Sequence, residues 1–310
     1  MYNSENIYVS VVVPIYNSSH LLSNLLDSLT VQTYKNFEVL ICDDGSTDDL
    51  LSIIKNYKNF LHINYFKLKN FGGPAMARNT GIKYSKGSLI AFVDADDWWD
   101  KNKLEISISK FDKETDIVFH NLKLMGKESS FFKNKIIKSK NLSLPIFNDL
   151  IMNGNTILNS SVVIRKNILI KANGISENKK MIAAEDYNLW LRVSLVTNKF
   201  KFINESLGYY YIQDGLSRTR DMSIPTRVAI EEFNNILSNK QKEIIKSRLN
   251  YIRAKYNKHI ENHSLSLSLF YSSLSLRGNL LKLKSLILIL HLYLIIISKF
   301  FIKIIYKKNE

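Results

Sequence analysis

The first hundred residues alternate between short apolar runs and segments with helical spacing. The apolar runs, which predict buried strands, are Val9 to Ile15, Phe37 to Cys42, His62 to Phe66 and Ser88 to Asp94. The helical segments are His20 to Gln32, Asp48 to Tyr57 with Ser46 as its candidate N-cap, and Pro74 to Tyr84. Strands that alternate with helices form parallel sheets covered on both faces. The chain is therefore predicted to be an α/β protein with a Rossmann-like, mostly parallel central sheet flanked by helices.

Polar motifs follow three of these strands. They are Tyr16-Asn17, Asp43-Asp44 and Asp94-Ala95-Asp96-Asp97. Ligands of open α/β sheets bind outside the carboxyl ends of the strands, so these motifs are expected to share one site. The first loop has neither G-x-G-x-x-G nor a Walker A lysine, which argues against a dinucleotide oxidoreductase or a P-loop enzyme. The single cysteine, Cys42, excludes an internal disulfide and a cysteine-based zinc site.

Three aspartates crowd into the third motif, where their charges repel one another unless a cation neutralises them. Carboxylate oxygens suit Mg²⁺ or Mn²⁺, and these metals commonly complete their coordination with substrate phosphates. The cluster therefore indicates a nucleotide-diphosphate site. The alternative is a polar loop whose aspartates cap a helix near residues 98–107.

Asp43, Asp44 and Arg78 also have two interpretations each. A carboxylate at the end of a strand can accept a hydrogen bond from a uracil N–H or a ribose hydroxyl, but Asp43 and Asp44 can equally shape a strand-to-helix turn. Arg78 lies on a helix that points to the same edge, where its guanidinium can stack on a base or pair with a phosphate. Taken alone, it is as often an ordinary surface arginine.

The order and spacing of five motifs resemble the family 2 inverting glycosyltransferases with the GT-A fold. The matching segments are Val11 to Asn17, Ser28 to Tyr34, Val39 to Asp48, Ala77 to Gly81 and Phe92 to Asp97. The resemblance is strong over residues 8–105 and extends to about Ser217. It implies that a sugar is transferred from a nucleotide donor with help from Mn²⁺ or Mg²⁺.

The same resemblance implies roles for single residues. The donor-binding set would be Pro14, Tyr16, Asp43, Asp44, Arg78, Asp94 and Asp96. Within it, Asp43 would contact the nucleobase and Asp96 the ribose or the metal. Asp97 would bind the metal, and Asp186 of the pair Glu185-Asp186 would be the catalytic base. The bland alternative for that pair is two acids in the first turn of a helix, favoured there by the dipole.

One loop departs from the family pattern. Relatives often carry Tyr-Arg-x-His followed by serines, whereas this chain has Tyr209 to Ser217 with Gln213 near the expected histidine. Glutamine cannot replace histidine as a metal ligand. Arg218 and Arg220 are the alternatives for a diphosphate contact from this loop.

The C-terminal region carries most of the net charge of +15. Residues 239–310 contain 14 Lys or Arg against three Glu, and an apolar helix is predicted at 280–306. Lys284, His291 and Ser298 recur every seven residues, which favours a helix lying on an anionic membrane surface. A helix buried against the catalytic domain or in a dimer is the alternative. No nucleic-acid-binding signature accompanies the charge, so no nucleic-acid partner is expected.

These inferences give a GT-A catalytic domain at residues 1–220, with a nucleotide-sugar-binding half (1–115) and an acceptor-binding half (116–220). A helical, basic region follows at 221–310. The expected activity is transfer from a UDP-sugar to a glycan or lipid-linked acceptor in cell-surface polysaccharide or lipopolysaccharide synthesis. The expected location is the cytoplasmic face of the bacterial inner membrane, as a peripheral protein, and homo-oligomerisation is left open. A nucleotidyltransferase and an inactive scaffold of a glycan-assembly complex are the alternatives.

Overall fold

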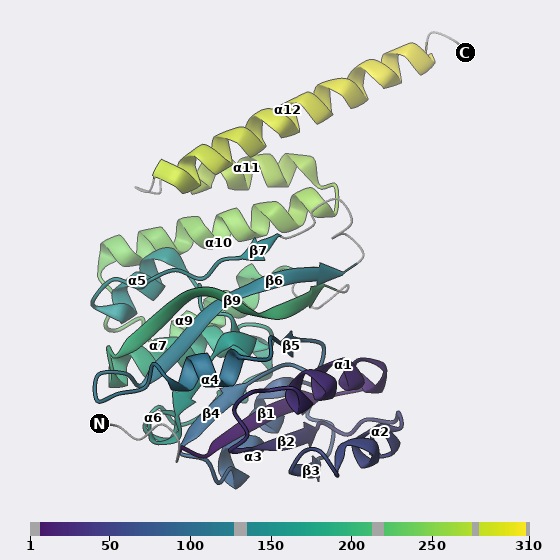
Figure 1. Cartoon of the computed structure of the whole chain (residues 1–310). Coiled ribbons are helices and arrows are strands. Elements are labelled where there is room, and N and C mark those ends of the chain that lie inside the picture. Colours follow the sequence, from purple (N-terminus) through teal and green to yellow (C-terminus); the bar gives the residue numbers. More distant parts are fainter. Residues whose placement is uncertain (1–6, 127–134, 213–219, 275–278, 308–310) are drawn as a thin grey trace. The chain divides into compact units, whose positions relative to one another are not determined.

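The computed structural model describes residues 7–126, 135–212, 220–274 and 279–307. The chain divides into two compact units, Met1–Gln213 and Asp214–Glu310. In the described part of the chain, the first unit holds every strand and the second is helical (Figure 1). Each unit is considered by itself below.

Four parallel strands form the first part of the central sheet, as predicted. They run in the order β3-β2-β1-β4, and helices connect β1 to β2, β2 to β3 and β3 to β4 (Figure 1). The bounds are β1 Val9–Ile15, α1 Ser19–Thr30, β2 Phe37–Asp43, α2 Leu50–Tyr57, β3 Ile63–Lys67, α3 Pro74–Tyr84 and β4 Leu89–Phe92. Every residue of β1, β2 and β4 is buried, which explains their unbroken apolar sequence.

The second part of the sheet runs in both directions, so the sheet as a whole is mixed. Its order continues as β4-β8-β6-β9-β5, with β7 paired to β6. β8 is antiparallel to β4 and β6, whereas β9 is parallel to β6 and antiparallel to β5. The bounds are β5 Trp98–Trp99, α4 Lys103–Ile108, β6 Ile117–Gly126, β7 Ile136–Ile137, α5 Ile146–Asn153, β8 Val163–Arg165, α6 Lys166–Lys171, α7 Glu185–Val196 and β9 Phe200–Ile212.

Both faces of the parallel strands are packed. Val11 and Val13 belong to one core cluster with the leucines of α1. On the other face, Val12 meets α3 at Gly81, where an added Cβ would lie 2.4 Å from Val12 Cγ1. Only glycine fits this contact without a shift of the helix or strand, so Gly81 brings α3 close to β1.

The predicted N-cap of α2 is wrong. The helix begins at Leu50, and the Asp49 side chain accepts a hydrogen bond from Ser52 N. Ser46 instead accepts a hydrogen bond through its Oγ from Asn17 N, at 2.9 Å, in the turn after β1. The N-cap lies three residues further on because residues 46–48, in the turn after β2, form hydrogen bonds with the turn after β1.

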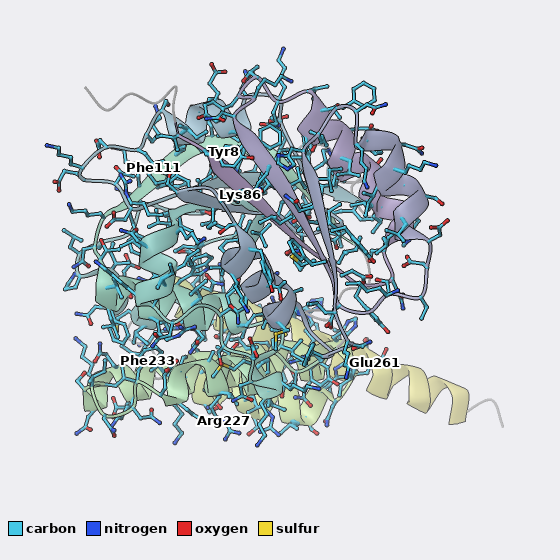
Figure 2. The ribbon with its side chains drawn as sticks, turned by 90° about the horizontal axis from the view of Figure 1, so that it is seen from below. Tyr8, Lys86, Phe111, Arg227, Phe233 and Glu261 are labelled. Atoms are coloured by element: carbon cyan, nitrogen blue, oxygen red, sulfur yellow. The ribbon has the colours of Figure 1, made fainter. Side chains whose placement is uncertain are left out.

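The second unit contains helices α9 (Ser223–Glu231), α10 (Asn239–His259), α11 (His263–Ser273) and α12 (Asn279–Lys307). Arg227, Phe233 and Glu261 of this unit are labelled in Figure 2. Its helices α10 to α12 share a small core of four fully or nearly fully buried side chains, Ala254, Phe270, Ile289 and Leu292. None of the helices in the described ranges is long and apolar enough to cross a membrane.

Candidate active site

The polar motifs gather at the carboxyl edge of the parallel strands. Tyr8 and Lys86, labelled in Figure 2, precede β1 and β4 and mark the opposite edge. After β1, Asn17 adopts a positive φ of 46° and ties the first turn to the second, because its Oδ1 accepts a hydrogen bond from Thr47 N at 2.9 Å. Tyr16 beside it is 48% exposed and available to a ligand.

Pro14 lies inside β1. It is buried and pairs with Cys42 of β2. Because proline has no N–H, it weakens the ladder near the carboxyl end of the strand and helps to end it there. The structure therefore gives Pro14 a part in shaping the turn that presents Tyr16.

Asp43 and Asp44 are buried, and each organises backbone. Asp43 accepts hydrogen bonds from Ser46 N at 2.7 Å and from the Tyr65 hydroxyl at 2.6 Å. Asp44 accepts three, from the amides of residues 71, 72 and 73, at 2.9 to 3.2 Å. Gly45 directly follows Asp44 and has φ +83°. A Cβ added to Gly45 would lie 2.8 Å from Asn70 N. The pair thus shapes two loops, which was the alternative interpretation of the sequence.

Arg78 joins the two acidic motifs. Its guanidinium donates to Asp94 Oδ1 and to Glu185 Oε1, each at 2.7 Å, and the residue is 4% exposed. The carboxylates of Asp94 and Glu185 raise the pKa of Arg78 against the effect of burial, so the guanidinium stays charged. Stacking on a base or pairing with a phosphate was predicted; in the structure both terminal nitrogens are engaged by carboxylates.

The turn after β4 holds the densest negative charge of the site. Asp97 is 1% exposed and accepts hydrogen bonds from Ser160 Oγ and Tyr211 N. Burial, Asp96 and Asp94 raise the pKa of Asp97 well above its usual range. Burial and then Asp94 raise the pKa of Asp96 to about 6. The alternative in which these aspartates cap a helix is wrong, because α4 begins only at Lys103 with Asn102 before it.

Asp186 opens α7 next to this cluster. Its Oδ1 accepts a hydrogen bond from Tyr187 N at 2.7 Å, and its Oδ2 accepts one from Asn155 Nδ2 at 3.0 Å. Burial and the adjacent charge of Glu185 raise the pKa of Asp186 to about 7, although Arg78 acts in the opposite direction. A carboxylate with such a pKa exchanges protons near neutrality, which suits a general base.

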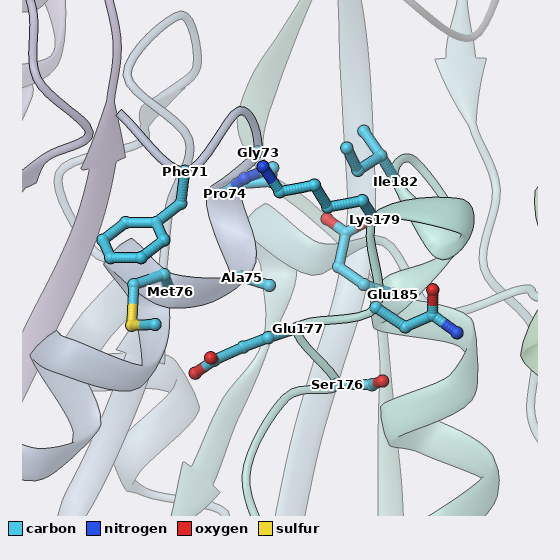
Figure 3. A pocket seen from close by; sticks show the side chains of 11 residues that line it. Phe71, Gly73, Pro74, Ala75, Met76, Ser176, Glu177, Lys179, Ile182 and Glu185 are labelled. Carbon is cyan, nitrogen blue, oxygen red and sulfur yellow. The ribbon is translucent and has the colours of Figure 1, made fainter. Parts of the chain in front are cut away.

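A cavity of about 140 Å³ lies between the start of α3 and the segment that leads into α7. Figure 3 shows Phe71 and Met76 on one side of it and Lys179 and Ile182 on the other. Glu185 also lines it, and its Oε2 is buried without a hydrogen-bond partner. A buried carboxylate oxygen without a donor is costly, so this oxygen is a ready acceptor for a ligand hydroxyl.

A divalent metal fits these residues only if the protein and a bound substrate share its coordination. In the described ranges, no three His, Cys, Asp or Glu side chains are grouped to hold a metal ion. The carboxylate of Asp96 accepts no hydrogen bond from another described residue, and burial, followed by the nearby charge of Asp94, raises its pKa. One or two carboxylates are enough for Mg²⁺ or Mn²⁺ when substrate phosphates supply further ligands. The donor set therefore fits a metal that arrives together with a diphosphate.

The structure does not test the two arginines predicted for the diphosphate. Arg218 and Gln213 lie outside the described residues. Arg220 belongs to the second unit and is half-buried there. Both remain predictions from the sequence.

The sequence analysis did not identify three residues that contribute hydrogen bonds to the site. Asn155, Asn159 and Ser160 donate to Asp186, Asp94 and Asp97 respectively. The available signal was weak: residues 153–161 are mostly amide and small polar side chains, but Ile157 and Leu158 interrupt them. Glu185 was noticed only as the neighbour of the expected base, and nothing in its sequence position indicates the pairing with Arg78.

Comparison with known proteins gives the family. The model of glycosyl transferase family 2 matches residues 10–173. An uncharacterised glycosyltransferase of Rickettsia conorii is 31% identical over 283 residues, 80% of this chain and 44% of that protein. The UDP-Glc:alpha-D-GlcNAc-diphosphoundecaprenol beta-1,3-glucosyltransferase of Escherichia coli is 33% identical over 198 residues, 63% of this chain and 73% of that protein. The chain spans less than half the length of several curated relatives that it matches.

Solved structures share the fold. The Staphylococcus aureus enzyme TarS in complex with UDP-GlcNAc has a TM-score of 0.60 at 21% identity, covering 89% of this chain and 83% of that one. A mannosyltransferase from Pyrobaculum calidifontis in complex with GDP-Man and Mn²⁺ has a TM-score of 0.59 at 16% identity, covering 92% and 80%. The predicted GT-A fold with a helical C-terminal region is thereby confirmed.

Proposed function

Because this chain belongs to glycosyl transferase family 2, we propose that it transfers a sugar from a UDP-sugar to a glycan or lipid-linked acceptor, with inversion at the anomeric carbon. The observation that carries this proposal is the double ion pair of Arg78. It ties Asp94, in the acidic turn after β4, to Glu185, in the first turn of α7. A donor end and a base end are thus held together, and transfer needs both.

The donor is assigned to the edge formed by the first two turns and the acidic turn. Tyr16 supplies an exposed ring for a nucleobase, and Asp43 and Asp44 fix the loops around it. UDP is proposed because the Escherichia coli relative uses UDP-Glc and the TarS structure holds UDP-GlcNAc. Asp96, with Asp97 behind it, would hold Mn²⁺ or Mg²⁺ against the diphosphate. When bound, such a metal stabilises the negative charge that develops on the leaving diphosphate.

Asp186 is assigned as the general base. Inversion requires an acceptor hydroxyl to attack the anomeric carbon from the face opposite the departing nucleotide, and one group must take the hydroxyl proton. Asn155 orients one oxygen of Asp186, and burial together with the charge of Glu185 raises the pKa of Asp186 to about 7. A base with this pKa is ionised in part at neutral pH and still holds a proton well. Arg78 acts as a positioning residue, because it fixes Glu185 next to the base.

The reaction can be tested without knowing the acceptor, by following slow hydrolysis of UDP-sugars with Mn²⁺. Asp186→Asn is expected to keep UDP binding within about threefold and to lose about a hundredfold or more of the turnover. Asp96→Asn is expected to lose the Mn²⁺-dependent part of UDP binding. Asp49→Asn is the matched control, since asparagine is an equally good N-cap for α2. Normal turnover in both site variants would refute the assignment of these residues, whereas no turnover by the wild-type protein would favour an inactive scaffold.

The acceptor and the location are proposed from the relatives and from α12. The Escherichia coli relative acts on a diphosphoundecaprenol-linked sugar, so a lipid-linked acceptor in cell-surface polysaccharide or lipopolysaccharide synthesis is the working assignment. We place the protein at the cytoplasmic face of the inner membrane, as a peripheral protein.

Helix α12 has two apolar faces, and only one is covered. Ser285, Ile289 and Leu292 are buried within the second unit. The opposite arc presents side chains that are 51 to 64% exposed: Leu283, Leu286, Ile287, Leu290 and Leu294. Lys284, which is exposed, borders this arc. An apolar stripe bordered by lysine is typical of helices that lie in the surface of anionic membranes.

Vesicle sedimentation tests this attachment. Leu290→Glu with Leu294→Glu should reduce binding to vesicles rich in phosphatidylglycerol by about tenfold or more. His291→Glu, on the exposed polar border of the same helix, should change it by less than threefold. If the double variant binds vesicles like the wild type but changes from dimer to monomer in light scattering, the stripe is a dimer interface instead.

A further inference from the structure

The second unit contains a cavity that the glycosyl-transfer chemistry does not use. It has a volume of about 460 Å³ and lies between α9 and α10. Volumes of this size are typical of small-molecule sites. Its apolar lining residues are Ile224, Ile245 and Leu249.

Four cations also line the cavity: Arg227 from α9, and Lys242, Lys246 and Arg253 from α10. Asp221 is the one acid among the lining residues, and its Oδ2 lies 3.6 Å from Arg253 Nε. That separation is longer than a charge-assisted hydrogen bond of about 2.8 Å, so the pair is loose. The lining therefore carries a clear excess of positive charge.

The two lysines are the strongest part of this excess. Lys242 and Lys246 are exposed and form no ion pair with any residue in the described part of the chain. Arg227, in contrast, has Glu231 one turn further along α9, at 3.6 Å. An anion that enters the cavity would meet two uncompensated ammonium groups and could recruit both arginines.

The spacing of the cations along α10 indicates the size of the anion that can contact all of them. Residues 242, 246 and 253 lie on one face of α10, since four and eleven residues are close to one and three full helical turns. At a rise of about 1.5 Å per residue they are spread over roughly 16 Å. A single phosphate cannot reach both ends of such a row. Several phosphate groups on one ligand can.

We infer that the cavity between α9 and α10 binds a ligand carrying two or more linked phosphate groups. Its polar groups Ser223, Asn234 and Asn250 add hydrogen-bonding capacity beside the cations. The binding itself is independent of glycosyl transfer.

The test is binding of soluble phosphates by calorimetry. Tripolyphosphate should bind the full chain at least tenfold more tightly than inorganic phosphate. Lys242→Gln with Lys246→Gln should weaken tripolyphosphate binding about tenfold or more. The control is Lys255→Gln with Lys258→Gln, which removes the same charge from the same helix but outside the cavity, and it should change binding by less than twofold.

A second arm separates the two sources of the phosphates. Vesicles containing cardiolipin, whose headgroup carries two phosphate groups linked through a glycerol, are offered to the Leu290→Glu/Leu294→Glu protein, with and without the substitutions at Lys242 and Lys246. If only vesicle binding depends on these lysines, the phosphates belong to lipid headgroups; if only tripolyphosphate binding does, they belong to a soluble ligand. Equal losses in the lining and control variants, or no loss in either arm, would overturn the inference. Because no arm measures turnover, failure here leaves the proposed function untouched.

Discussion

The two acidic motifs that end β2 and β4 contain the same residue type in opposite surroundings. The carboxylates of Asp43 and Asp44 accept five hydrogen bonds, four of them from main-chain amides. In the turn after β4, burial and then the neighbouring carboxylates raise the pKa of both Asp96 and Asp97. A carboxylate that only shapes a loop can be fully satisfied by the protein. A carboxylate kept short of donors costs stability, and we interpret that cost as readiness for an external cation.

The largest effect on stability is expected from Arg78, the cation that the protein itself supplies to the acidic motif after β4. Arg78→Met would leave Asp94 and Glu185 without their partner and should lower the free energy of unfolding by about 3–5 kcal/mol. Urea denaturation measures it. Adding Glu185→Gln should restore part of the loss, because one buried charge then disappears. A loss below about 1 kcal/mol would mean that Arg78 does not hold the motif together.

Asp44→Ala tests the satisfied motif. Three amides of residues 71–73 would lose their acceptor, so the free energy of unfolding should fall by about 1–3 kcal/mol. Asp44→Asn, which keeps one acceptor oxygen, should lose less. Equal stability of all three proteins in urea denaturation would show that water can replace the Asp44 carboxylate as the acceptor for these amides. The two acidic motifs would then differ less than proposed.

Asp96→Asn should instead raise the free energy of unfolding of the metal-free protein. The pKa of Asp96 is raised to about 6, so the folded state binds a proton more tightly than the unfolded state, and stability falls as the pH rises from about 4 to 6. Above that window the variant should be more stable than the wild type by about 1–2 kcal/mol. Unfolding at pH 5 and pH 7.5 gives the difference. A variant less stable than the wild type at pH 7.5 would contradict the interpretation that the ionised carboxylate of Asp96 destabilises the metal-free protein.

The smallest effect concerns the base that lies beside the cluster. With a pKa of about 7, Asp186 must lose its proton to act, so turnover with saturating donor should fall about fivefold between pH 7 and pH 6. Glu185→Gln removes the neighbouring charge that helps to raise this pKa and should move the midpoint to lower pH. An unchanged midpoint would assign the profile to another group.

Local patterns predicted most of the sheet and much of the site. Helix α3 was predicted with its bounds, since Pro74 suits a first helical position and the apolar spacing stops at Tyr84. The N-cap of α2 was missed because Ser46, Asp48 and Asp49 are all good caps and only the turn geometry selects among them. The role of Arg78 was missed for a different reason. Its partner Glu185 is 107 residues away, and nothing local in the sequence indicates that pairing.

The hydrogen bonds of Asp97 have a consequence for how the site can arise. Its two donors, Ser160 and Tyr211, follow it by 63 and 114 residues, and both belong to the part of the first unit beyond residue 115. A polypeptide that stops at residue 115 would contain the whole acidic motif and Arg78, but neither of the donors to Asp97. During synthesis the motif therefore emerges well before it acquires its final geometry. Fragments 1–115 and 116–310, produced separately, should acquire affinity for UDP only on mixing.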